Sequence, residues 1–272
     1  MEIKAADVAK LRKMTGAGLM DCKKALVEAE GDFSKAKDII REKGKLIANK
    51  RADRDAAEGI MVSQIIGNKG YILCLACETD FVAKNESFEE NTNNFLKIAI
   101  ENDSADLKAL LATDVKGQTV QEMATALSGT IGEKIEIPFY ARVEAPMIGS
   151  YIHMNKKLGT LVGFSCEIDK DVAHDVAMQA TAMAPIAIDK CDVPAEVLAK
   201  ELEIGMQQAR EEGKPEAILE KIGNGKVNKF IKENTLMNQA LVKNNKMTVA
   251  EFIHNENADV KINAYERYSL ND

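Results

Sequence analysis

Tryptophan is absent from this chain of 272 residues, and phenylalanine and tyrosine together make up only 5% of it. No run of about 18 apolar residues occurs, so an ordinary membrane-spanning helix is excluded. The first residues lack an apolar signal region, and Glu2 and Asp7 argue against a transit peptide. Five cysteines, an odd number, in a chain of this length are typical of a reducing compartment. We therefore expect a cytoplasmic protein with no membrane association.

The motifs of common catalytic and metal sites are also missing. Gly16-Ala17-Gly18 is followed neither by the third glycine of a dinucleotide-binding fingerprint nor by the Gly-Lys-Ser/Thr of a P-loop. The three histidines have no metal-ligand spacing. Cys74 and Cys77 form a CxxC pair inside a strand-like run, where side chains three residues apart point to opposite faces. We therefore predict no catalytic residues, no metal, no cofactor and no enzyme activity, and expect the function to rest on binding.

Charge is distributed unevenly along the chain. The whole chain has 46% hydrophobic and 29% charged residues, which fits a soluble globular protein, and its net charge of −7 argues against direct nucleic-acid binding. Residues 1–54 contain 14 Lys/Arg and 9 Asp/Glu, giving +5, whereas the remainder carries −12. A small basic module on an acidic body suggests an acidic partner surface for the module. An ordinary solvated charged surface is the alternative.

Three short helices are predicted within residues 1–44. Each has apolar residues at three- and four-residue intervals: Val8, Leu11 and Met14; Leu19, Cys22, Leu26 and Ala29; Phe33, Ala36, Ile39 and Ile40. Gly31 is expected to end the second helix, Asp32 to cap the third, and Gly44 to end the third. The charged, alanine-rich residues 45–57 predict a helical linker.

From Gly59 the pattern becomes that of strands, and it contains an internal repeat. Strands are predicted at 59–66 and 70–77, joined by a hairpin turn at 67–70. Helices are predicted at 88–101, 104–112 and 119–127, and a further strand at 135–143. Residues 70–80 align with 159–169 at a constant offset of 89, with Gly, Cys, Glu and Asp matching. Two related α+β subdomains are therefore expected, with chance similarity of two amphipathic hairpins as the alternative.

A helical hairpin is predicted at 195–233, interrupted by Gly213-Lys214-Pro215, and a last helix and strand are predicted around 249–253 and at 258–268. The predicted fold class is α+β: an N-terminal three-helix bundle, then a core of repeated antiparallel hairpin-plus-helix units with an inserted helical hairpin. The expected division is a docking module at 1–44, a linker at 45–57, core subdomain N at 58–145, core subdomain C at 146–194 and 234–272, and the inserted hairpin at 195–233.

The turn that follows the first copy of the repeat retains a large apolar side chain, Phe81. Phe81 is either tucked into the core or exposed for a partner, and burial statistics favour the core. The equivalent position in the second copy is Lys170, so the scaffold does not require an aromatic ring there. Asp80 is matched by Asp169, so helix capping is an alternative to a binding role for Asp80.

Three segments resemble signatures of the elongation factor Ts family. They are 15–26 (TGAGLMDCKKAL) with Gly31-Asp32 following, 79–84 (TDFVAK) and 149–153 (GSYIH). The resemblance covers nearly the whole chain and implies a ubiquitin-associated-type bundle, a two-subdomain core and an inserted hairpin. It also implies a guanine nucleotide exchange factor that binds GDP-bound and nucleotide-free elongation factor Tu during protein synthesis. A homodimer of the 1:1 complex is compatible with this assignment.

The resemblance further assigns residues to partner binding. In the family, a turn enters the GTPase and disturbs its Mg²⁺ and phosphate site; the matching residues here are Thr79, Asp80, Phe81, Val82 and Ala83. The resemblance assigns N-terminal docking to Arg12, Leu19, Met20 and Lys23, and a core contact to His153. Two departures are expected to reduce the interface: Gln239-Ala240-Leu241-Val242 replaces the frequent Gln-Pro-Phe-Val, and the C-terminal helical module of some members is missing.

Two other functions compete with this assignment. A non-catalytic adaptor would use the three-helix module to bind ubiquitin-like or helical partners, and would have no need of Phe81 in an exposed turn. A thiol enzyme would use Cys77, but the strand position and the lack of a nearby basic residue argue against it.

Overall fold

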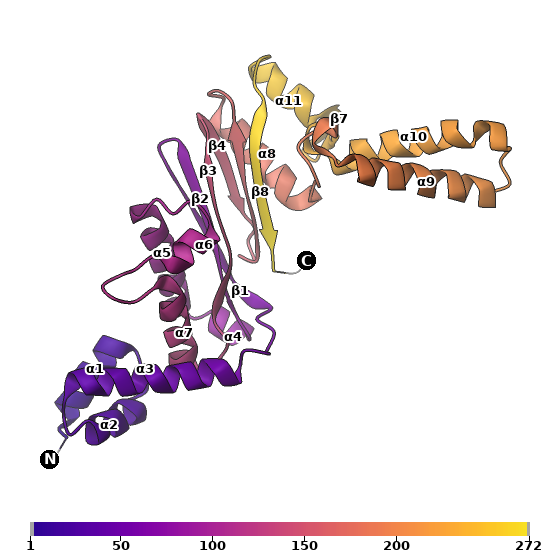
Figure 1. Cartoon of the computed structure of the whole chain (residues 1–272). Helices are drawn as coiled ribbons and strands as arrows, with labels where there is room; N and C mark the ends of the chain where they lie inside the picture. Colours follow the sequence, from indigo (N-terminus) through magenta and orange to yellow (C-terminus); the bar gives the residue numbers. More distant parts are fainter. Residues whose placement is uncertain (1–2, 271–272) are drawn as a thin grey trace.

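The computed structural model describes residues 3–270 and is elongated. A helical bundle forms one end, two small sheets form the middle, and a pair of helices projects from the other end (Figure 1). Among the described residues, no helix has both the length and the apolar character needed to cross a bilayer.

The N-terminal bundle consists of α1 (Ala5–Thr15), α2 (Leu19–Glu28) and α3 (Phe33–Lys50). Its core is small and contains Val8, Leu11, Ala17, Cys22, Ala25, Leu26, Ala29 and Ala36. Gly16 adopts φ 70° after α1, and the Asp32 carboxylate accepts hydrogen bonds from the backbone N–H groups of Ser34 and Lys35. The predicted helices and the predicted Asp32 cap are therefore confirmed.

The predicted end of the third helix at Gly44 is wrong, because α3 continues to Lys50. Gly44 instead packs against α7 (Val120–Ile131), and a Cβ added to Gly129 would lie 2.1 Å from the Cα of Gly44. Two facing glycines let the helices approach closely, so Gly44 serves a helix crossing rather than a helix end. The predicted helical linker at 45–57 is helical only to Lys50; residues 51–54 form a turn and a bend, and residues 55–57 have no regular secondary structure.

Two three-stranded antiparallel sheets form the middle of the molecule. Their strand orders are β1-β2-β3 and β4-β5-β8, and both predicted repeat copies supply a central strand, β2 and β5. The strands are β1 (Glu58–Ile66), β2 (Lys69–Cys77), β3 (Glu136–Glu144), β4 (Met147–Ile152), β5 (Leu158–Phe164) and β8 (Ile262–Ser269). An apolar cluster joins the sheets and includes Met61, Ile72, Cys74, Val143, Ile148 and Leu161.

Helices cover the outer face of each sheet. The first sheet is covered by α4 (Asp80–Ala83), α5 (Glu86–Glu101), α6 (Leu107–Ala112) and α7. The second is covered by α8 (Lys170–Met183), and α11 (Val249–Glu256) packs against α8 and completes the second core. The largest buried rings of the first core are Phe88 and Phe95, both on α5, and β5 contributes Phe164 to the second core. The one-turn helix α4 was not predicted, because four residues are too short to show helical periodicity.

Cys74 and Cys77 point to opposite faces of β2, as predicted. Cys74 belongs to the cluster between the sheets, and Cys77 to the cluster under the helices. Burial raises the pKa of both thiols, that of Cys77 to about 12. A thiol in that range is protonated near neutral pH, which argues against nucleophilic use of Cys77.

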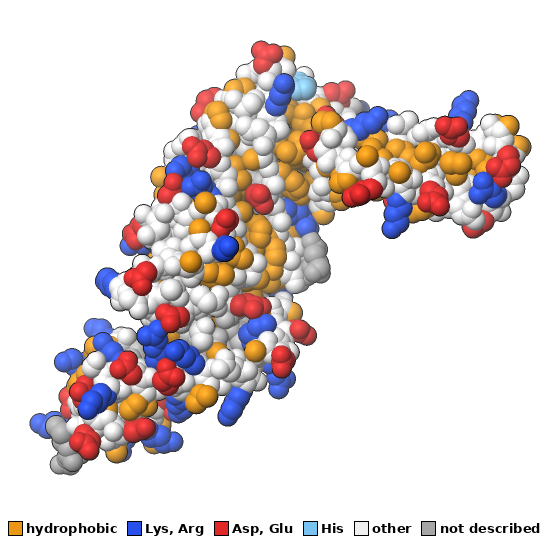
Figure 2. Space-filling view, in the orientation of Figure 1, with side chains coloured by type: hydrophobic (Ala, Val, Ile, Leu, Met, Phe, Trp, Pro, Cys, Tyr) orange, Lys and Arg blue, Asp and Glu red, His pale blue; other side chains and the backbone are white. Residues whose placement is uncertain are grey.

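The projecting pair of helices consists of α9 (Ala195–Glu211) and α10 (Glu216–Asn234). They cross where Gly205 faces Gly223, and apolar side chains line the visible face of the pair (Figure 2). At its base lie a short strand pair that was not predicted, β6 (Ala240–Leu241) and β7 (Asn244–Thr248), and the 3₁₀ turns η1 (Lys190–Asp192) and η2 (Leu236–Asn238).

Candidate partner-binding surface

Phe81 is held outside the core. It lies in α4 and is 84% exposed, while Val82 packs against the first core and Ala83 is buried. The Thr79 hydroxyl accepts a hydrogen bond from the backbone N–H of Val82 at 3.5 Å and so caps α4. The turn is therefore anchored through Val82 and Ala83, the third and fourth residues of α4, and the aromatic ring of Phe81 is exposed to solvent.

A reciprocal set of hydrogen bonds fastens this turn to the loop after α7. The Glu133 carboxylate accepts from the backbone N–H groups of Glu78 and Thr79 at 3.1 and 3.0 Å, and from the Thr79 hydroxyl at 2.6 Å. In return, the Glu78 carboxylate accepts from the backbone N–H of Lys134 at 2.6 Å and from the Arg51 guanidinium at 2.8 and 2.9 Å. We call Arg51, Glu78, Glu133 and Lys134 the clamp.

Within the clamp, the surroundings of Glu78 favour its charged form. The hydrogen bond from Lys134 and then the Arg51 guanidinium hold the pKa of Glu78 below its ordinary value. Hydrogen bonds to ionised groups are about twice as strong as neutral ones. The clamp was not predicted from the sequence, because its two carboxylates lie far apart in the chain and follow no periodic pattern.

Asp80 does not cap a helix, so that alternative is wrong. Thr79 takes the cap position of α4, and Asp80 is its first residue, paired with Lys84 at 2.6 Å. This ion pair lowers the pKa of Asp80. In the second repeat copy, Asp169 does cap α8 by accepting from the backbone N–H groups of Asp171 and Val172. The two copies therefore diverge at this turn.

The turn between β4 and β5 lies against elements that flank α4. The Lys156 carbonyl accepts from the backbone N–H of Met61 at 2.6 Å, and the side chains of Lys156 and Lys157 pair with Glu89 at 2.5 Å and Glu58 at 2.6 Å. At the tip of this turn Met154 is 91% exposed. Sequence reasoning missed Met154, because a single apolar residue in a turn gives no pattern.

His153 lies next to Met154 and lines a groove of about 230 Å³ on the second half of the molecule. The groove is mainly apolar and is lined by residues that include Tyr151, Met178, Leu241 and Val242. The Nδ1 atom of His153 is buried and has no hydrogen-bond partner among the described residues. Leu241 belongs to the second core, so it does not extend from the surface, whereas Val242 is exposed.

The four predicted docking residues are exposed on the N-terminal bundle. Arg12 lies on α1, and Leu19, Met20 and Lys23 lie on α2, with the exposed Met14 at the end of α1. They are separate from the Phe81 turn, which lies at the far end of α3 and α7 (Figure 1). The structure therefore places both α4 and the β4–β5 turn against β1 and α5, but leaves the bundle residues as a second surface.

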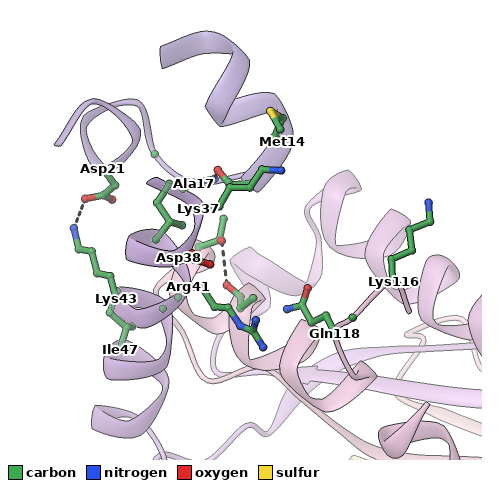
Figure 3. A pocket seen from close by; sticks show the side chains of 18 residues that line it. Met14, Ala17, Asp21, Lys37, Asp38, Arg41, Lys43, Ile47, Lys116 and Gln118 are labelled. Atoms are coloured by element: carbon green, nitrogen blue, oxygen red, sulfur yellow. Dashed lines mark hydrogen bonds and ion pairs between the residues drawn. The ribbon is translucent and has the colours of Figure 1, made fainter. Parts of the chain in front are cut away.

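A groove of about 430 Å³ separates the bundle from the loop before α7. Asp21 and Lys43 form an ion pair on its bundle side, while Arg41 and Gln118 face each other across it (Figure 3). Arg41 also pairs with Glu122 of α7 at 2.6 Å, which ties the bundle to the first core.

Comparison with known proteins identifies the family of this chain. The family model described as Elongation factor TS matches residues 78–272. The chain is 48% identical over 273 residues to elongation factor Ts of Christiangramia forsetii, covering 99% of both chains. It is 43% identical over 272 residues to the Azobacteroides pseudotrichonymphae protein of that name, covering 100% of this chain and 99% of the relative. The chain belongs to the elongation factor Ts family. An elongation factor Ts chain is a factor of translation and protein biosynthesis, and the α+β fold agrees with that family.

Proposed function

We propose that this chain is a guanine nucleotide exchange factor for elongation factor Tu and promotes GDP release during protein synthesis in the cytoplasm. The observation that carries the proposal is Phe81, an 84% exposed aromatic ring on a turn fastened at its base by the clamp. An apolar ring held in water by a fixed turn is suited to insertion into a partner. Membership of the elongation factor Ts family supports the identity of that partner.

The physical basis of exchange is thermodynamic linkage. A factor that binds the nucleotide-free GTPase more tightly than the GDP-bound form weakens GDP binding by the same ratio. Mg²⁺ is a dominant local charge at a phosphate site, so moving the elements that hold Mg²⁺ lowers nucleotide affinity without any chemical step. In this proposal Thr79–Ala83 enter that region of the partner, with Phe81 leading and the Asp80 carboxylate beside it.

The size of the effect can be bounded. Burying a phenylalanine side chain contributes about 1.5–3 kcal/mol, which corresponds to roughly one to two powers of ten in an equilibrium constant. Exchange factors that act more strongly than this need other contacts. We assign those to Arg12, Leu19, Met20 and Lys23 on the basic bundle and to His153 beside the apolar groove.

The proposed factor binds both GDP-bound and nucleotide-free elongation factor Tu, and the 1:1 complex is compatible with a homodimer. It acts without chemistry of its own and without direct nucleic-acid contact. We also propose the functional division of the chain as the bundle for docking, the two sheet-and-helix halves for the core contacts, and the hairpin as an insertion.

The test is release of fluorescently labelled GDP from elongation factor Tu, chased with unlabelled GDP. Adding this chain is expected to accelerate release, and Phe81→Ala is expected to remove much of the acceleration. Ile218→Ala, which shortens an exposed apolar side chain on α10, serves as the matched control and is expected to behave as the unmodified chain. Absence of acceleration by the unmodified chain would refute the proposal.

An adaptor function keeps one observation in its favour, the exposed Leu19 and Met20 on the bundle. It predicts that a helical or ubiquitin-like partner binds equally well to the unmodified chain and to Phe81→Ala. Nucleotide exchange predicts instead that Phe81→Ala loses much of the acceleration of GDP release. The unmodified chain and Phe81→Ala, measured side by side, therefore separate the two functions.

A further inference from the structure

The clamp connects three parts of the molecule that are remote in sequence. Arg51 directly follows α3, Glu133 and Lys134 follow α7, and Glu78 precedes the turn that carries Phe81. Their hydrogen bonds run in both directions, since each carboxylate accepts from the backbone of the segment that carries the other. Such a reciprocal arrangement fixes the backbone of the turn rather than only one side chain.

The clamp also continues into the bundle. α3 and α7 pack through Gly44 and Gly129, where a Cβ added to Gly129 would collide with the backbone of Gly44, and Arg41 pairs with Glu122 at the other end of α7. Two packed helices therefore lead from the bundle surface to the base of the Phe81 turn. Closely packed protein interiors have low compressibility and transmit strain, so a displacement of the bundle is expected to move α3 and α7 as rigid bodies.

The second repeat copy shows that this arrangement is not required by the scaffold. Glu167 occupies the position of Glu78 in the alignment, yet it is exposed. The helix that follows it, α8, is capped by Asp169 and begins without a one-turn helix like α4. The same hairpin framework can thus close without a clamp, so the clamp needs an explanation in the first copy.

We propose that the clamp is a positioning element for nucleotide exchange, in which Glu133 holds the Phe81 turn in its exposed conformation and in a fixed position relative to the docking bundle. This inference rests on the proposed exchange function. Glu133 touches no nucleotide in this scheme, so it acts through Phe81. In enzyme active sites, misplacement of a group by about 1 Å can cost about a hundredfold in rate, which sets an upper scale for the effect here.

The first experiment measures the conformation of the turn directly. Because the chain has no tryptophan, Phe81→Trp introduces a single fluorescent reporter at the tip of the turn. Adding Glu133→Gln to this variant is expected to lower the anisotropy of the tryptophan in the free protein. The amide has one acceptor oxygen in place of two and carries no charge, so it holds the Thr79 hydroxyl and the two backbone N–H groups more weakly and the turn becomes mobile. Glu167→Gln removes the same charge at an exposed site and is expected to leave the anisotropy unchanged. Unchanged anisotropy with Glu133→Gln would overturn the proposal.

The second experiment is a double-mutant cycle on GDP release from elongation factor Tu. Glu133→Gln alone is expected to slow release by about threefold to tenfold, and in the Phe81→Ala background by less than about twofold, because its effect passes through Phe81. An equal factor in both backgrounds, or no effect in either, would refute a positioning role. Circular dichroism checks that each variant is folded. If Glu133→Gln does not fold, the cycle is repeated with Arg51→Gln, which lies at the half-exposed side of the clamp.

The two experiments separate failure of the inference from failure of the proposed function. If Phe81→Ala releases GDP normally while Glu133→Gln lowers the anisotropy, the clamp holds the turn but the turn does not drive exchange. If Phe81→Ala slows release and Glu133→Gln changes neither readout, the exchange function stands and the clamp proposal is wrong.

Discussion

Replacing Phe81 by alanine is expected to slow GDP release far more than it destabilises the protein. Since the residue is 84% exposed, only about a sixth of it is covered, and complete burial of such a side chain contributes about 1.5–3 kcal/mol. The loss of folding free energy should therefore stay below about 0.5 kcal/mol. If the ring is fully buried in the complex with elongation factor Tu, Phe81→Ala should remove most of those ~1.5–3 kcal/mol from the free energy of the complex. That loss corresponds to a factor of about ten to a hundred in an equilibrium constant.

The assay uses one sample for both measurements. A thermal melt followed by circular dichroism should show a shift of at most about 2 °C for Phe81→Ala, because 1 kcal/mol shifts the melting temperature of a chain of this size by about 2–4 °C. Phe95→Ala is the matched control: that ring is 2% exposed, so its removal should cost about 3–5 kcal/mol. A large drop in melting temperature with normal GDP release for Phe81→Ala would refute the reasoning.

Four further predictions follow from the same structure. The purified chain alone should neither bind GDP at micromolar concentration nor hydrolyse GTP, as equilibrium dialysis and phosphate release would show; either activity would contradict the exchange-factor proposal. Deleting residues 1–44 should leave a chain that still melts cooperatively but binds elongation factor Tu more weakly in calorimetry, with some loss of melting temperature because the cut uncovers α7 at Gly129; unchanged affinity at low salt would exclude the bundle as a docking element. Met154→Ser should weaken the complex without changing the melting temperature, since the side chain is 91% exposed at the tip of the β4–β5 turn, and an unchanged dissociation constant would remove it from the interface. Hydrogen bonds from Lys69, Tyr71 and Arg142 lower the pKa of Asp103 from its ordinary value of 3.8 to about 2, so its stabilising contribution should be complete above about pH 5 and disappear as pH falls through about 2; melting curves of Asp103→Asn should then differ from the unmodified chain at pH 6 and converge with it at pH 2.

Local patterns in the sequence determined much of the framework. Apolar residues at helical spacing predicted α1, α2 and most of α3, and a glycine-containing turn between two apolar runs predicted the β1–β2 hairpin. The repeat predicted a second hairpin, and its mismatch at Lys170 correctly indicated that the fold does not need Phe81 in the core. These features are local because they depend on which face of one element is apolar.

Tertiary structure alone decided the features that depend on two distant segments. Gly44 is read locally as a helix end, but its contact with Gly129 makes it the crossing point of a longer helix. The exposed position of Met154 depends on how the β4–β5 turn lies against β1 and α5. The clamp pairs Glu78 with the loop that carries Glu133, and polar groups that satisfy one another across the fold leave no periodic trace in either segment. Amphipathic periodicity reports which side of an element is buried, whereas the partner of each buried side or polar group is settled only when the elements pack.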